Sequence, residues 1–239
     1  MSINKQRVVI LGGTSGIGLA VATAALADGA EVVVASRSKA RVGDALATLG
    51  SGAEGHIIDA SGEGAIRDFF EKVPPFDHLV YTAGEALQLL TLDAEISMLR
   101  KFFEARYWGA LAAVKYGHRK IRTGGSIVLT SGTAGARPMG AGWVAASSIC
   151  AATEGMTRAL AVELKPLRVN SVAPGVVRTP LWSGMTETDQ QSLYASEAAR
   201  LPVGHAGDPA EVAGAYLYLM GQTYVTGQVL HVDGGGLLA

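Results

Sequence analysis

Short apolar segments alternate along the chain with longer stretches in which polar and apolar residues mix. The apolar segments are rich in β-branched residues and lack polar alternation, which is the pattern of strands buried on both faces of a parallel sheet. They are Val8–Leu11, Val32–Ala35, His56–Ile58, Leu79–Thr82, Ile127–Thr130, Val169–Val172 and Val229–Val232. The mixed stretches predict helices at Ile17–Asp28, Lys39–Leu49, Glu63–Lys72, Leu92–Arg122, Ala145–Lys165 and Pro209–Met220. This order predicts an α/β fold, a doubly wound parallel sheet of about seven strands with helices on both faces.

The alternation continues without a break in composition or a long linker. Although 239 residues exceed the length of an average domain, an open α/β sheet commonly takes up such a length. We therefore expect residues 1–239 to form a single domain. Residues 181–207 fit the pattern least, because they are polar, then Ala-rich, and follow a strand end. This segment is either a mobile lid over a substrate pocket or an ordinary surface helix and loop.

The composition excludes several classes of protein. With 49% hydrophobic and 17% charged residues, the chain is unlike disordered sequences. Its 20 basic and 21 acidic residues leave no positive surplus, so nucleic acid is not an expected partner. The single cysteine, Cys150, excludes an internal disulfide and a cysteine-rich metal site, and we expect no bound metal. No apolar run reaches the roughly 18 residues of a membrane helix. The start MSINKQRVVIL lacks a secretory signal pattern, which predicts a cytoplasmic protein.

A glycine-rich turn joins the first predicted strand to the first predicted helix. Strand Val8–Leu11 continues directly into the sequence GGTSGIG at residues 12–18. A pyrophosphate needs a tight turn, close backbone approach and free N–H groups at a helix N-terminus. The place of this turn, between strand and helix, strengthens a signal that is weak by itself. We therefore predict that a nucleotide binds at Gly12, Thr14, Ser15, Gly16, Ile17 and Gly18.

The end of the second predicted strand decides which nicotinamide cofactor fits. An acidic residue there would bind the ribose 2′-hydroxyl of NAD and repel a 2′-phosphate. The chain instead has Ser36 and Arg37, a hydroxyl and a guanidinium that suit a phosphate, which predicts NADP(H). Alternatively, Arg37 stacks on the adenine or faces solvent. At Asp59 and Ala60, after the third strand, Asp59 either accepts a hydrogen bond from the adenine amine or caps the next turn.

Four motifs occur together in an order and spacing that point to one enzyme family. They are Gly12-xxx-Gly16-Ile17-Gly18, Thr82-Ala83-Gly84, the sequence RVNSVAPGVVRT at residues 168–179, and a C-terminal segment between Gly207 and Gly235. Together they resemble the short-chain dehydrogenase/reductase family over nearly the whole chain. The resemblance implies a Rossmann-like fold. It also implies cofactor contacts at Ala83 and Gly84, and a nicotinamide loop at Pro174, Gly175, Val177 and Thr179.

The resemblance further implies a homodimer or homotetramer. The predicted helices Leu92–Arg122 and Ala145–Lys165 support this expectation, because they hold many small and apolar residues. Such residues let helices of two subunits approach closely and would otherwise expose apolar surface to water.

The chain departs from the family at the catalytic residues. The family uses an Asn, a Ser and a Tyr-xxx-Lys pair, in which the Tyr donates a proton to a carbonyl while NAD(P)H delivers a hydride. The aligned positions here hold Arg106 for the Asn, Gly132 nearest the Ser, Ala146 for the Tyr and Cys150 for the Lys. No Tyr-xxx-Lys occurs between residues 124 and 175. Cys150 lies in an apolar stretch, where it is interpreted as a small buried residue rather than an acid.

Three residues are candidates to replace the missing chemistry. Arg106 either faces the pocket, where it clamps an oxyanion or a carboxylate, or pairs with a neighbour such as Glu104 or Glu85. Ser131, at a strand end, bonds the substrate or the nicotinamide, or else only backbone groups. Trp143 stacks on a flat substrate or donates its indole N–H, or else anchors a loop.

Two functions follow from these motifs. The first is an NADP(H)-dependent oxidoreductase that transfers a hydride to a small carbonyl, enone or imine substrate by a non-standard active site. The second is a non-catalytic NADP(H)-binding sensor or interaction protein on the same scaffold. The nicotinamide loop with Thr179 favours the enzyme, because a mere binder need not hold the reactive end of the cofactor. Since Arg106 would repel an iminium, a substrate that forms an oxyanion or carries a carboxylate suits it better.

Overall fold

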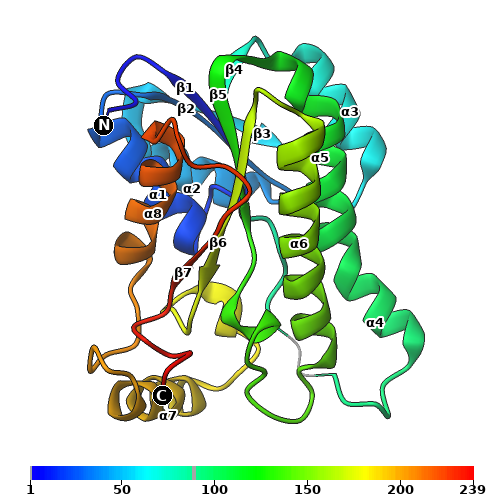
Figure 1. The fold of residues 1–239 in the computed structure, drawn as a ribbon, viewed down its shortest axis with the longest axis vertical. Coiled ribbons are helices and arrows are strands. Elements are labelled where there is room, and N and C mark those ends of the chain that lie inside the picture. Colours follow the sequence, from blue (N-terminus) through cyan, green and yellow to red (C-terminus); the bar gives the residue numbers. More distant parts are fainter. Residues whose placement is uncertain (1, 88–89) are drawn as a thin grey trace.

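The computed structural model describes residues 2–87 and 90–239, which form a seven-stranded parallel sheet (Figure 1). The strands are β1 (Arg7–Leu11), β2 (Glu31–Ser36), β3 (Ala53–Ile57), β4 (Phe76–Tyr81), β5 (Ile121–Thr130), β6 (Arg168–Pro174) and β7 (Val229–Val232). Their order is β3-β2-β1-β4-β5-β6-β7, and each neighbouring pair is parallel. The order reverses between β1 and β4, where a doubly wound sheet opens a crevice for a ligand. The predicted fold is confirmed.

Helices cover both faces of the sheet, as predicted (Figure 1). They are α1 (Gly16–Ala27), α2 (Lys39–Leu49), α3 (Glu63–Lys72), α4 (Ile96–Phe103), α5 (Gly109–Gly117), α6 (Val144–Glu163), α7 (Glu187–Arg200) and α8 (Pro209–Gly221). Helices α1, α2 and α8 pack with Val8 and Ile10 of β1, and α3, α5 and α6 share a core with Val9 and Leu11. Because helices cover both faces, these four residues are buried and show no polar alternation.

Within the part of the chain that the structure describes, none of the helices combines the length and apolar character needed to cross a membrane.

The single helix predicted over Leu92–Arg122 is confirmed only in part. Residues 96–117 are helical, but a wide π-helical turn at Glu104–Trp108 separates α4 from α5, and the chain enters strand β5 at Ile121. The wide turn has a local partner, because the hydroxyl of Tyr81 donates a hydrogen bond to the carbonyl of Ala105. A carbonyl that a side chain satisfies needs no helical N–H partner, so the helix can widen there.

Helix α7 lies within residues 181–207, the segment that fits the strand-and-helix pattern least. It buries Tyr194 in a small apolar cluster with Val176, Trp182 and Ala206. The apolar pattern did not give the bounds of this helix, because most of its residues are polar and few of them are buried. A helix therefore stands where the sequence left a lid and a surface helix as alternatives.

A buried histidine in strand β4 has a pKa well below its ordinary value. His78 of β4 is 1% exposed, and its ring nitrogens lie 2.8 Å from Oγ of Ser126 and 2.7 Å from Oε1 of Gln6. Burial and the positive charge of Arg168 lower the pKa of His78 to about 4, against a weaker opposite effect of Asp77. The folded protein therefore keeps this ring neutral in a pH range where an exposed ring takes up a proton.

We expect the free energy of unfolding to fall as the pH drops from about 6.5, the ordinary pKa of histidine, toward 4. The unfolded chain binds a proton in this window and the folded chain does not, so His78 contributes a loss of up to about 3 kcal/mol. Urea unfolding at pH 7 and at pH 5 measures the difference. A His78→Gln variant should show a shallower pH dependence, and an unchanged slope would contradict the assignment.

Candidate active site

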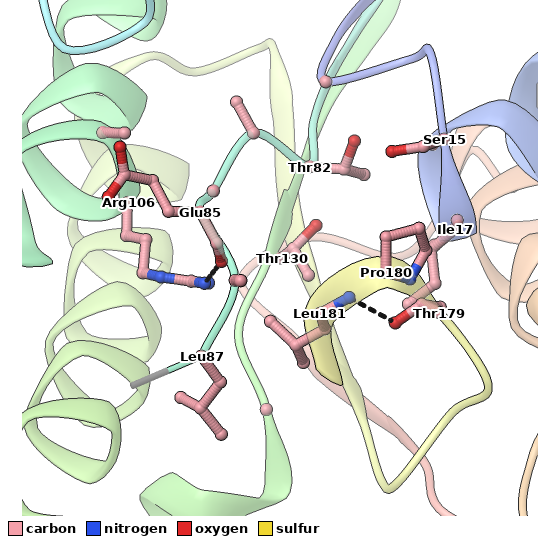
Figure 2. A pocket seen from close by; sticks show the side chains of 18 of the residues that line it. Ser15, Ile17, Thr82, Glu85, Leu87, Arg106, Thr130, Thr179, Pro180 and Leu181 are labelled. Atoms are coloured by element: carbon pink, nitrogen blue, oxygen red, sulfur yellow. Dashed lines mark hydrogen bonds between the residues drawn. The ribbon is translucent and has the colours of Figure 1, made fainter. Parts of the chain in front are cut away.

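The carboxyl ends of the strands open into a cleft of about 570 Å³ (Figure 2). Every residue that the sequence nominated for cofactor binding or catalysis lines this cleft. They are Gly12, Thr14, Ser15, Gly16, Ile17, Gly18, Ser36, Arg37, Asp59, Ala60, Ala83, Gly84, Arg106, Ser131, Trp143, Pro174, Gly175, Val177 and Thr179. The parallel sheet brings them together, because the loops that follow its strands all leave at the same edge.

The glycine-rich loop between β1 and α1 packs directly on the segment that follows β4. A Cβ at Gly18 would lie 2.3 Å from the carbonyl oxygen of Gly12. A Cβ at Gly12, where φ is +94°, would lie 2.5 Å from the backbone nitrogen of Ala83. Ser15 precedes α1 and makes no capping hydrogen bond with its side chain, which leaves the first N–H groups of the helix to an anion. The loop therefore has the shape and polarity that a pyrophosphate needs.

Asp59 follows β3 and caps the next turn. Its Oδ1 accepts hydrogen bonds from the backbone nitrogen of Ser61 at 2.9 Å and from Oγ of Ser61 at 2.7 Å. These hydrogen bonds lower the pKa of Asp59. Of the two interpretations drawn from the sequence, the structure shows the turn cap.

Arg37 follows β2 and forms an ion pair that the sequence did not predict. Its Nη1 lies 2.6 Å from Oε1 of Glu85, which comes after β4. No local sequence pattern predicts this ion pair, because the two residues are 48 positions apart. Arg41, in the first turn of α2, also lines this end of the cleft and is a second cation that no sequence motif indicated.

Arg106 lies in the π-helical turn, and Figure 2 shows its side chain reaching toward Glu85. Its Nη2 donates a hydrogen bond to the backbone carbonyl of Glu85, whose carboxylate pairs with Arg37 instead. The guanidinium carbon lies 4.8 Å from the ring centroid of Phe102. Nε is buried and has no hydrogen-bond partner among the described residues. Burial lowers the pKa of Arg106, but a guanidinium titrates so high that it stays charged at neutral pH.

Two neighbours hold Arg106 in place. The hydroxyl of Tyr81 bonds the carbonyl of Ala105, one residue earlier, and burial raises the pKa of Tyr81, so the hydroxyl stays a donor. Gly84 lies against the guanidinium, since a Cβ there would come within 2.7 Å of Nη1 of Arg106. Tyr81 thus supports the turn that carries Arg106.

One wall of the cleft comes from α6 and the end of β5. Ala146 and Cys150, at the positions that the resemblance gives to Tyr and Lys, both line it. Burial raises the pKa of the Cys150 thiol to about 11, so the thiol is uncharged at pH 7. Oγ of Ser131 lies 3.2 Å from the carbonyl oxygen of Cys150 and 3.1 Å from Oε1 of Glu154. The sequence did not predict Glu154 as a site residue. The only feature that could have indicated it is its spacing of four residues from Cys150, which places both side chains on one face of the helix.

Two segments meet over the cleft. The backbone nitrogen of Leu87 donates to the carbonyl of Leu181 at 2.8 Å, and that of Leu181 donates to Oγ1 of Thr179 at 3.3 Å (Figure 2). Trp143 packs in one apolar cluster with Trp182, whose indole N–H bonds the carbonyl of Val177. Trp143 thus anchors the loop before α6, and its side chain also lines the cleft.

Comparisons with known proteins agree with this architecture. The family model described as "Enoyl-(Acyl carrier protein) reductase" matches residues 12–236. The short-chain dehydrogenase/reductase ATR9 of Stachybotrys chlorohalonatus is 35% identical over 254 residues, which cover 99% of each chain. A solved small-chain dehydrogenase in complex with NADPH is 37% identical, with a TM-score of 0.87 over 99% of this chain and 100% of its own. The MalC reductase/Diels-Alderase of Malbranchea aurantiaca is 28% identical, with a TM-score of 0.92 over 99% of this chain and 98% of MalC. This chain therefore belongs to the short-chain dehydrogenase/reductase family of oxidoreductases.

Proposed function

We propose that this protein is an NADP(H)-dependent oxidoreductase that transfers a hydride to a small carbonyl, enone or imine substrate without a Tyr-Lys pair. The observation that carries the proposal is the position of Arg106, a half-buried cation that lines the cleft and whose buried Nε has no hydrogen-bond partner among the described residues. Burying an incompletely paired charge costs free energy. A reductase uses such a charge to stabilise the negative charge that develops in its transition state.

The cleft fits a dinucleotide with a 2′-phosphate. Gly12 and Gly18 have no room for a Cβ, and the loop they close faces the N-terminus of α1. We infer that this loop holds the pyrophosphate, that Ser36 and Arg37 hold the 2′-phosphate, and that the nicotinamide lies against residues 174–179. The solved relative with NADPH supports this choice. When bound, NADP(H) supplies or accepts the hydride.

The chain's own residues act on the substrate oxygen. Arg106 stabilises the negative charge that develops there, because a fixed cation in a site shielded from water acts more strongly than one in bulk solvent. Ser131 hydrogen-bonds near the reacting centre, and Trp143 forms a wall for the substrate. Neither Arg106 nor the high-pKa thiol of Cys150 gives up a proton readily at neutral pH, so water supplies the proton.

The charge of Arg106 also sets a preference among substrates. A cation near the reacting centre repels an iminium and attracts a carboxylate or a developing oxyanion. We therefore favour carbonyl and enone substrates, especially acidic ones, over cationic imines.

Turnover with NADPH tests the proposed function. The purified protein is mixed with NADPH and a panel of ketones, enones and imines, and the loss of NADPH absorbance is followed against blanks without protein or substrate. Turnover above the blank supports the enzyme. Tight NADPH binding without turnover of any substrate class would favour the alternative, a non-catalytic NADP(H)-binding sensor or interaction protein.

Arg37→Ala should weaken NADPH binding by about ten- to a hundredfold, because a charge-assisted phosphate contact contributes roughly 1.5–3 kcal/mol. NADH binding should stay nearly unchanged, since NADH has no phosphate at this position. Titration calorimetry with both cofactors measures the two affinities. Equal losses for NADPH and NADH would show that Arg37 does not recognise the phosphate.

We also propose that the protein assembles as a homodimer or homotetramer in the cytoplasm. Exposed apolar side chains on and beside α4 and α5, at Ile96, Met98 and Trp108, support assembly, because contact with a second subunit would remove them from water.

A further inference from the structure

We propose that Glu85 is a cofactor-discriminating residue, because it occupies the arginine that would read the 2′-phosphate until NADP(H) displaces it. The inference rests on the proposed binding of NADP(H) and adds a residue to it that no motif nominates. It concerns one ion pair, between Nη1 of Arg37 and Oε1 of Glu85, at 2.6 Å.

The ion pair stands in the path of the cofactor. Arg37 follows β2 and Glu85 comes after β4, and β1 lies between these two strands in the sheet. Their side chains therefore meet across the carboxyl end of β1, where the glycine-rich loop starts at Gly12. Both residues line the same cleft as that loop. A dinucleotide that lies on the loop and reaches Arg37 with its 2′-phosphate must compete with the Glu85 carboxylate.

The Glu85 carboxylate can leave without the rest of its segment. The backbone around it is held separately, because Arg106 bonds the carbonyl of Glu85 and the nitrogen of Leu87 bonds the carbonyl of Leu181. The ion pair itself is partly exposed, with 60% of the Arg37 side chain and 38% of the Glu85 side chain accessible to water. Exposed pairs of this kind are weak, so a bidentate phosphate contact can replace the carboxylate.

The two cofactors differ in what they offer Arg37. NADP(H) carries a 2′-phosphate, which replaces the Glu85 carboxylate as the partner of the Arg37 guanidinium. The negative phosphate then repels the negative Glu85 side chain. NAD(H) brings no phosphate, so Arg37 gains nothing by leaving Glu85. Glu85 therefore weakens the binding of NADP(H), which must displace it, and leaves the binding of NAD(H) unaffected, so it narrows the preference for NADP(H) that Arg37 creates. Asp59, whose pKa Arg37 helps to lower, is the other carboxylate near this guanidinium.

Glu85→Gln tests the proposal, with NADPH and NADH affinities measured by titration calorimetry at low and high salt. Removing the competitor should tighten NADPH binding by about two- to fivefold, the range that an exposed ion pair allows. NADH affinity should stay the same, and the gain for NADPH should shrink at high salt. In an Arg37→Ala background, Glu85→Gln should leave NADPH affinity unchanged, because the guanidinium for which Glu85 and the phosphate compete is absent.

A matched control is Glu63→Gln. Glu63 pairs with Lys115 at 2.8 Å and lies outside the cleft, so this variant changes the net charge equally without touching Arg37. It should leave NADPH affinity unaltered. If the parent protein binds NADPH but Glu85→Gln binds it no more tightly, or binds NADH more tightly to the same degree, the role of Glu85 is refuted and the proposed function stands. If neither the parent nor Glu85→Gln binds NADPH, both proposals fail.

Discussion

Arg106→Ala is expected to lower kcat by about 10²–10³, the loss that follows removal of one preorganised group from a developing oxyanion. NADPH affinity should stay within a few-fold, because Arg106 lies across the cleft from Ser15 and Ile17 of the glycine-rich loop (Figure 2). Steady-state kinetics with a substrate found in the panel, together with calorimetry of NADPH, separates the two effects. The loss should appear in kcat more than in KM, since the charge acts in the transition state.

Two further variants sharpen this prediction. Arg106→Lys keeps a positive charge but loses the planar fork that bonds the Glu85 carbonyl, so it should retain part of the rate. Arg100→Ala removes an exposed arginine from α4, outside the cleft, and should leave kcat unchanged. If Arg106→Ala matches the parent protein on every substrate that it turns over, Arg106 has no catalytic role and the non-catalytic alternative gains support.

The triple variant Arg106→Asn/Ala146→Tyr/Cys150→Lys is expected to gain ketone reduction, by up to the factor of about 10²–10⁴ that a placed general acid supplies. The double variant that keeps Arg106 should gain little. Arg106 and Cys150 are close enough for the charge of each to shift the pKa of the other, so a lysine at 150 would stand beside a second cation in the same cleft. We therefore expect that an arginine at 106 and a lysine at 150 destabilise one another, so that both positions have to be changed in the same variant.

NADPH-dependent turnover of the same ketone panel compares the triple variant, the double variant and the parent. A triple variant with Phe in place of the new Tyr at position 146 serves as control, because it keeps the ring without the proton donor. Equal rates with Phe and with Tyr would mean that the new hydroxyl does no chemistry. A double variant as active as the triple would refute the proposed conflict between the two cations.

The sequence could predict those parts of the site that depend on local backbone shape. The turn at Gly12–Gly18 and the loop at Pro174–Thr179 are each a continuous stretch of sequence. In a parallel sheet, the strand order alone brings the two stretches to the same edge. The strands were recognisable for a similar reason, because burial of β1 on both faces leaves an unbroken apolar run.

The parts that failed depend on contacts between distant residues. The π-helical turn within the helix predicted over Leu92–Arg122 accompanies the hydroxyl of Tyr81, 24 positions before Ala105. The partner of Arg37 comes from another strand end, and Glu154 reaches Ser131 from α6. The hydrophobic periodicity of the sequence does not predict such contacts, because each of these residues by itself is an ordinary polar or aromatic position. They become visible only when the fold is known.

The π-helical turn makes the shape of the cleft depend on the number of residues in the turn as well as on their identity. Such a turn holds one residue more than a regular helix of the same span, so the helices on its two sides differ in phase by about 100°. Helix α5 is fixed under the sheet by Ala110, Ala113 and Val114. A one-residue deletion between Glu104 and Trp108 would therefore rotate α4 about its own axis and carry Phe102 away from Ala145 and Ile149 of α6, with which it packs. An insertion or deletion in this turn would reshape the cleft more than most substitutions in its walls.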